Sequence, residues 1–123
     1  MERKPTRSFE ELVVWQKAHQ FVLGVYRITK MFPDDEKFGL TAQFRRAAVS
    51  IAANIAEGYR KRTPNDKVRF MNIAEGSLEE CRYYLILARD LGYADIAALW
   101  ELSDQVRKLI LAYGKAILKT DGQ

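Results

Sequence analysis

The stretch LTAQFRRAAVSIAANIAEGYRKRTPND, residues 40–66, contains a complete predicted helix, the turn after it and the start of another helix. Its main apolar residues recur at steps of three and four, which places them on one face of an α-helix. They are Leu40, Phe44, Ala48, Ile51, Ile55 and Tyr59. Thr63, Pro64 and Asp66 then supply an N-cap, a proline at the first helical position and an acid near the positive end of the helix dipole. The stretch therefore predicts two consecutive helices joined by a short turn.

The same periodicity extends over the rest of the chain. It predicts helices at about 9–31, 40–60, 64–91 and 95–118. Ser8 and Glu11 have capping-box spacing, Pro33 stops the first helix, and Gly92 is suited to a left-handed cap after the third. We expect an all-α fold: an up-down-up-down antiparallel four-helix bundle forming one domain, residues 1–123, with residues 1–7 as a basic flexible tail.

Composition places the chain among globular proteins. It has 123 residues, of which 48% are hydrophobic and 29% are charged, enough for one domain with a core. The single cysteine, Cys81, excludes an internal disulfide framework and suits a reducing compartment. No apolar run approaches the roughly 20 residues that span a bilayer. We expect a cytoplasmic protein with no membrane partner.

Two of the predicted helices are apolar on more than one side, although a monomeric bundle needs only one apolar face per helix. The extra apolar residues are Val49, Ala52, Ala53, Ala56, Tyr83, Ile86 and Leu87. We interpret them as an interface between subunits of a homo-oligomer. The alternative is that the alanines are simply good helix formers on an exposed surface.

The pentapeptide Asn-Ile-Ala-Glu-Gly occurs twice, at residues 54–58 and 72–76. Because glycine weakens a helix, each copy predicts a close approach of two backbones. Polar residues also follow helical spacing here: Arg46, Ser50, Asn54 and Glu57 on one helix, with Ser77 and Glu80 on the next. We interpret this set as a structural polar network that fixes register, the alternative being a catalytic cluster.

Positive charge is concentrated in the middle of the chain. Residues 37–70 hold eight cations and two acids, whereas the whole chain carries a net charge of +4. The candidate nucleic-acid-binding residues are Arg60, Lys61, Arg62, Lys67, Arg69 and Arg45. Such a concentration favours binding to a polyanion, and the alternative is a solvated turn.

The sequence offers no evident catalytic site. His19 and Cys81 have no recognisable nucleophile–base partner, and no glycine-rich phosphate loop or metal-ligand motif is present. We expect a protein that is not an enzyme and that has no cofactor and no metal.

Several motifs carry a resemblance to a known family. Residues 9–12 (FEEL) and 14–18 (VWQKA) open it, residues 43–51 (QFRRAAVSI) and 54–58 (NIAEG) form its centre, and residues 76–80 (GSLEE) and 91–93 (LGY) extend it. Together they resemble the four-helix-bundle proteins encoded within intervening sequences of bacterial 23S ribosomal RNA genes. The resemblance covers about residues 8–118 and implies a ring-like homopentamer. A related member, the accessory variability determinant protein of diversity-generating retroelements, binds nucleic acid and a reverse transcriptase.

Two functions follow from these observations. The leading hypothesis is a non-catalytic, oligomeric nucleic-acid-binding protein whose partner is RNA, ribosomal RNA being one candidate, or DNA. The alternative is a protein-interaction scaffold that holds a partner enzyme such as a reverse transcriptase. The ribosome is a further candidate partner under the first hypothesis.

Overall fold

The computed structural model describes residues 8–121, with the side chains of residues 8–119; the predicted basic tail, residues 1–7, lies outside them. Four long helices dominate this part of the chain, and it contains no β-strand. They are α1 (Val13–Thr29), α2 (Leu40–Arg60), α3 (Pro64–Asp90) and α4 (Ala97–Asp121). Short 3₁₀ helices, Phe9–Glu11 and Asp34–Glu36, precede α1 and α2. The expected all-α fold with four helices is confirmed.

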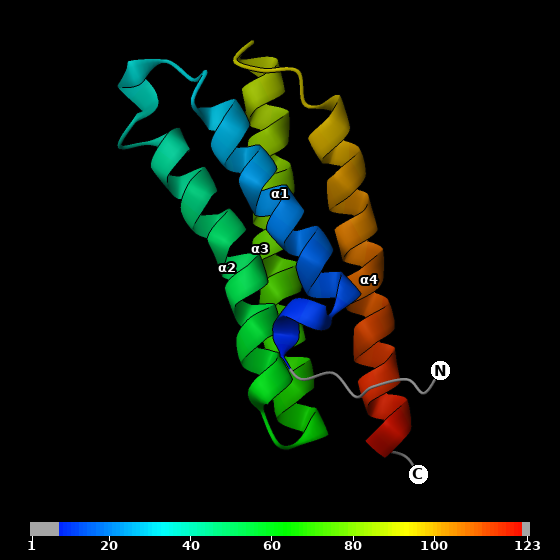
Figure 1. Cartoon of the computed structure of the whole chain (residues 1–123). Coiled ribbons are helices and arrows are strands. Elements are labelled where there is room, and N and C mark those ends of the chain that lie inside the picture. Colours follow the sequence, from blue (N-terminus) through cyan, green and yellow to red (C-terminus); the bar gives the residue numbers. More distant parts are fainter. Residues whose placement is uncertain (1–7, 122–123) are drawn as a thin grey trace.

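Each long helix packs against two others. Helix α1 contacts α2 and α4, and α3 contacts the same two helices. Figure 1 shows the α2–α3 turn at one end of the group of helices, and the α1–α2 and α3–α4 links at the opposite end. The turn between α2 and α3 is therefore well separated from the other two links.

The core consists of the apolar faces that the periodicity predicts. In α3 the six residues of the predicted stripe, Met71, Ala74, Leu78, Cys81, Leu85 and Ala88, are all buried. In α2 the stripe from Leu40 to Ile55 is buried, and Tyr59 is partly exposed. Phe44 is fully buried, with its ring 5.6 Å from that of Tyr84 on α3. The burial of these faces is the main favourable contribution to the stability of the fold.

The ends of α3 are as predicted. Thr63 Oγ1 accepts a hydrogen bond from the backbone N–H of Asp66 at 3.2 Å, and Pro64 is the first helical residue. After the helix, Gly92 adopts φ +75°, and Tyr93 N–H donates to the carbonyl of Ala88 at 2.8 Å. This is the left-handed C-terminal cap that glycine accommodates without strain.

The start of the first helix differs from the prediction. Ser8 accepts from the backbone N–H of Glu10, not Glu11, and so caps the 3₁₀ helix Phe9–Glu11. Leu12 then has extended backbone angles, and α1 begins only at Val13. The predicted capping box at Ser8 is therefore wrong, because a short turn closes before the long helix starts.

The two copies of the pentapeptide have different roles. A Cβ atom at Gly58 would lie 2.9 Å from Phe70 Cβ and 2.9 Å from Met71 Cε, so α2 and α3 approach closely there. A Cβ atom at Gly76 would meet nothing within 4 Å. The predicted close approach is confirmed at Gly58 and is wrong at Gly76, which is an exposed helical glycine.

This contrast gives a paired stability prediction. Gly58→Ala should lower the free energy of unfolding by about 1–3 kcal/mol, because the added methyl group overpacks the α2–α3 contact. Gly76→Ala should raise it by up to about 1 kcal/mol, because alanine favours the helix and meets no neighbour. Urea unfolding followed by circular dichroism measures both, and destabilisation of equal size in the two variants would contradict the assignment.

Candidate nucleic-acid interface

The basic turn, defined as Arg60, Lys61, Arg62, Lys67 and Arg69, joins the end of α2 to the first turns of α3. The three arginines are exposed, and the two lysines are half-buried. Because α2 ends where α3 begins, residues 60–62 lie beside residues 67–69 of the next helix. The fold thus brings together the main cluster of cations that the sequence predicted.

The lysines of the basic turn have structural contacts. Lys67 Nζ donates to the carbonyl of Tyr59 at 2.6 Å, satisfying a carbonyl in the last turn of α2, and burial lowers the pKa of Lys67. Lys61 Nζ lies 4.9 Å from the centroid of the Phe70 ring, where Arg69 also packs at 5.2 Å. These contacts hold the turn in place.

Acidic side chains neutralise little of the positive charge of the three arginines. Asp66 approaches Arg69 at 4.0 Å, at the outer limit of an ion pair, and both side chains are exposed. Within residues 8–119, Arg60 and Arg62 form no ion pair with another side chain. The turn therefore presents uncompensated positive charge to solvent, as a phosphate-binding surface does.

Arg45 does not belong to this surface. Its Nε donates to Thr29 Oγ1 at 2.8 Å, and its guanidinium carbon lies 4.7 Å from the Tyr26 ring centroid. Arg45 precedes Arg60 by 15 positions on one helix, a separation of roughly 22 Å along its axis. Arg45 therefore lies apart from the basic turn and joins α2 to the end of α1, and its predicted role in nucleic-acid binding stays a prediction.

A hollow of about 540 Å³ opens beside the basic turn. It is lined by Ser8, Phe9, Ala56, Glu57, Tyr59, Arg60 and Lys61. Sequence reasoning missed this hollow, because Phe9 and Tyr59 are far apart in the chain. The 3₁₀ helix that carries Phe9 lies against α2, as Figure 1 shows.

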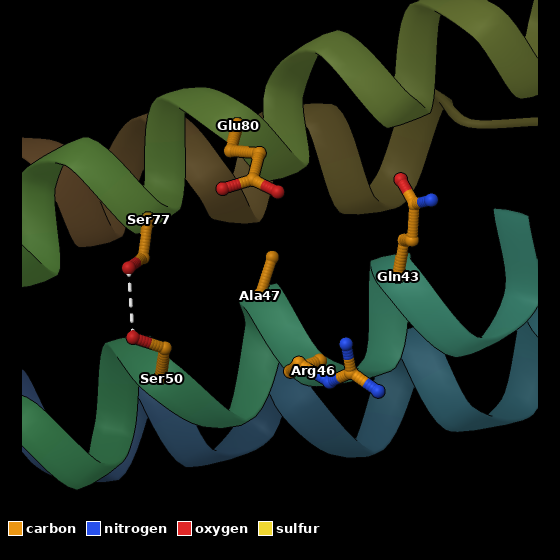
Figure 2. Close-up of a pocket in the computed structure, with 6 residues that line it drawn as sticks. All are labelled: Gln43, Arg46, Ala47, Ser50, Ser77 and Glu80. Carbon is orange, nitrogen blue, oxygen red and sulfur yellow. Dashed lines mark hydrogen bonds between the residues drawn. The ribbon is translucent and has the colours of Figure 1, made fainter.

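The predicted polar network exists in part, in a groove between α2 and α3 (Figure 2). Ser50 Oγ and Ser77 Oγ point toward each other and share a hydrogen bond of 2.8 Å. Asn54 Nδ2 donates to the Ser50 carbonyl at 2.8 Å and to Ser50 Oγ at 3.0 Å. These three residues connect the two helices and restrict their register.

The other three predicted members have separate surroundings. Glu80 accepts a 2.5 Å hydrogen bond from Tyr84, and this bond, with burial, raises the pKa of Tyr84 to about 12. Arg46 lines the same groove, and Glu57 lies in the hollow beside the basic turn. Placing Glu57 in one network with Ser50 is thus wrong, because helical rotation directs it toward the 3₁₀ helix Phe9–Glu11.

The second apolar side of α2 faces a groove formed with α1. Its lining consists of Phe9, Trp15, His19, Val22, Val49, Ala52, Ala53 and Ala56, around a volume of about 340 Å³. Val49 is 43% exposed, whereas Ala52 is only 9% exposed. Ala52 was expected to need a partner subunit, and this is corrected because the chain itself covers it.

The predicted apolar residues of α3 differ among themselves. Tyr83 is 59% exposed, Ile86 is half-buried, and Leu87 packs against the core of its own chain. Leu87 is therefore partly accounted for within the monomer, while Tyr83 retains a large exposed ring.

A polar cluster between α3 and α4 was not anticipated. Arg82, with its side chain 14% exposed, donates to Ser103 Oγ at 3.1 Å and packs 4.1 Å from the Trp100 ring centroid. Asp104 accepts from Arg107, which together with Lys108 lowers the pKa of Asp104. The sequence signal was the close spacing of Trp100, Ser103 and Asp104 on the inner side of α4. The cluster joins two helices and lies apart from the basic turn.

The histidine and the cysteine that were considered as catalytic candidates have ordinary packing. The His19 ring stacks on Trp15 with centroids 4.8 Å apart. Cys81 is completely buried, and burial raises the pKa of its thiol. A neutral, enclosed thiol is a poor nucleophile.

Cys81 should accordingly resist a thiol reagent in the native protein. At a pH of about 8.5, where an ordinary thiol is half ionised, we expect the native protein to react at least about 100-fold more slowly than the urea-unfolded chain. Absorbance of the released chromophore measures both rates. A rapid reaction of Cys81 in the native protein would show that the reagent reaches the inner face of α3.

The described residues contain neither a metal-binding cluster nor a membrane-spanning helix. Among residues 8–119, no three His, Cys, Asp or Glu side chains gather closely enough to hold a metal ion. No helix in the described part of the chain is long and apolar enough to cross a bilayer.

Taken together, the fold and the surface define a small all-α protein with four helices, a basic turn at one end and an apolar groove along one side. The family model for the 23S rRNA-intervening sequence protein matches residues 10–112. The chain belongs to this family. It is also similar to a solved structure, a protein of unknown function from the S23 ribosomal protein family of Bacteroides thetaiotaomicron. The two share 26% identity with a TM-score of 0.77, over 84% of this chain and 99% of the other. No curated protein matches the chain significantly.

Proposed function

We propose that this protein is a non-catalytic, oligomeric nucleic-acid-binding protein of the cytoplasm, and that it contacts the phosphates of RNA through the basic turn. The observation that carries the proposal is the pair of exposed arginines, Arg60 and Arg62, with no ion-pair partner in residues 8–119. Phosphate contacts of this kind need no base sequence and supply much of the affinity for nucleic acid.

The proposed binding unit is a ring-like homo-oligomer of antiparallel, up-down-up-down four-helix chains. The part of the apolar groove between α1 and α2 that is lined by Trp15, Val22 and the exposed Val49 supports assembly, because such a surface is favourable when a partner covers it. The number five comes from the family resemblance. Several basic turns on one assembly would raise affinity for one RNA through effective concentration.

The absence of catalysis is also part of the proposal. Its support is the stacked environment of His19 and the buried, neutral thiol of Cys81. They are the one histidine and the one cysteine of the chain: His19 is exposed and stacked on Trp15, and Cys81 lacks the exposure that a nucleophilic thiol needs.

Fluorescence anisotropy with a labelled hairpin RNA and a duplex DNA of equal length tests the proposal. We expect saturable binding to both at low salt and a preference for the RNA, whose loop offers unpaired bases. If the protein binds neither the RNA nor the DNA, the proposed function is overturned.

The second candidate function is a scaffold that holds a protein partner, such as a reverse transcriptase, through apolar contacts. The observation that favours it is the exposure of Tyr83 on α3, away from the basic turn. A specific partner should then remain bound in about 1 M salt, where phosphate contacts are screened, and after nuclease treatment. Loss of the partner under either condition would exclude this function.

A further inference from the structure

The proposed function uses Arg60 and Lys61 at the hollow beside the basic turn, but it gives no role to the other residues that line this hollow. Its walls come from two segments, Ser8–Phe9 before α1 and residues 56–61 at the end of α2. Its volume of about 540 Å³ lies within the range of pockets that hold small organic ligands. The Phe9 ring is held in place by an edge-to-face contact with Trp15, at 5.1 Å between centroids.

The lining combines three kinds of chemistry. Phe9, Ala56 and Tyr59 supply apolar and aromatic surface, which suits a flat ring. Arg60 and Lys61 stand in the same lining as cations. Glu57 adds a carboxylate to an otherwise basic site.

Glu57 is available to a ligand. It precedes Arg60 and Lys61 by three and four residues on α2, the spacing of helical ion pairs, yet it pairs with neither. Lys61 lies against the Phe70 ring instead. The carboxylate oxygens of Glu57 therefore keep their capacity to accept hydrogen bonds within the site.

An unpaired nucleotide matches this combination, and guanine matches it best. A carboxylate repels phosphate, so it must meet a part of the ligand that donates hydrogen bonds. Guanine presents two parallel donors on its Watson–Crick edge, N1–H and the 2-amino group, which fit the two oxygens of one carboxylate. Adenine offers its amino group alone, and uracil offers one imino group. Charge-assisted pairs of this type are strong and directional.

We propose that the hollow holds an unpaired guanine base of RNA, with Glu57 accepting from N1–H and the 2-amino group and the adjoining phosphates lying on Arg60 and Arg62. The inference rests on the proposed function and adds base selectivity to it. The basic turn then supplies affinity for any RNA, and the hollow selects strands with an unpaired guanine beside the contact.

The test uses the full-length protein and RNA hairpins that differ only in one loop base: guanine, inosine or adenine. Inosine lacks the 2-amino group and keeps N1–H. We expect the guanine hairpin to bind about tenfold or more tightly than the inosine hairpin, because inosine loses one hydrogen bond to the charged carboxylate of Glu57. Glu57→Gln should remove that preference, because the side-chain amide cannot accept at both positions.

The second copy of the pentapeptide provides the matched control. Glu75 occupies the same position in its copy and lies in a separate groove between α3 and α4. Glu75→Gln changes the net charge equally and should retain the full guanine preference. Equal affinities for the three hairpins in the unmodified protein, or an unchanged preference in Glu57→Gln, would overturn the inference.

The outcomes separate the two proposals. If the hairpins bind equally and Arg60→Glu with Arg62→Glu abolishes binding, the guanine site is refuted and the RNA function stands. If no hairpin binds at all, the proposed function fails. Crosslinking of 4-thiouridine placed next to the loop guanine should map to Phe9 or Tyr59, and crosslinks confined to other helices would count against the hollow.

Discussion

The double variant Arg60→Glu, Arg62→Glu should lose affinity for structured RNA by about 100-fold at moderate salt. Both side chains are exposed and neither has an ion-pair partner in residues 8–119, so reversing them removes contacts to phosphate and adds repulsion. The lysines of the turn are left in place, because Lys67 and Lys61 hold the α2–α3 junction. Fluorescence anisotropy with a labelled hairpin measures the change.

Arg27→Glu with Lys30→Glu is the matched control. These cations lie at the end of α1, and Figure 1 places that end opposite the α2–α3 turn. Both double variants lower the formal net charge from +4 to 0. The control should change RNA affinity by less than about threefold at moderate salt, since distant charges are screened. Equal losses in the two variants would mean that net charge, and not the basic turn, controls binding.

The second large effect concerns assembly. Val49→Glu should convert the proposed oligomer into monomers of 14.2 kDa, because it places a charge in the apolar groove between α1 and α2. Val49 is 43% exposed within the chain, so the substitution should leave the helical circular dichroism of the monomer unchanged. Sedimentation velocity measures the mass, which for the unmodified protein should be about five times that of the chain.

Leu111→Glu provides the comparison, because Leu111 is 47% exposed and lies in the separate groove between α3 and α4. We expect this variant to keep the oligomeric mass. A monomeric unmodified protein would refute the assembly, and an oligomer that survives Val49→Glu would place its interface elsewhere.

The helices and their buried faces were largely predictable from the sequence. The stripe from Met71 to Ala88 is buried as its spacing indicates, because each position of a regular helix has a defined direction. The predicted range 40–60 also agrees with the bounds of α2, because Gly39 immediately precedes this helix and Thr63 and Pro64 start the next one. Local signals of this kind need no knowledge of the other helices.

The capping box at Ser8 failed for a local reason, whereas the other errors come from contacts, or missing contacts, between residues distant in sequence. Arg45 stands among the candidate nucleic-acid-binding residues because a charge count ignores which end of α2 a residue occupies. The sequence predicts a close approach at Gly76 because its pentapeptide is identical to that of Gly58, but no atom lies within 4 Å of a Cβ placed at Gly76. The hollow that joins Phe9 to Tyr59 has no local signal at all, because it exists only when the first segment folds against α2.

The salt dependence of RNA binding tests the central claim most directly. The affinity of the unmodified protein for a hairpin RNA is measured from about 50 to 500 mM salt, and its logarithm is plotted against the logarithm of salt concentration. If the three exposed arginines of one basic turn each contact a phosphate, the slope should be about −2 or steeper, and it should become shallower in the Arg60→Glu, Arg62→Glu variant. Absence of binding at the lowest salt, or a slope near zero, would contradict the account.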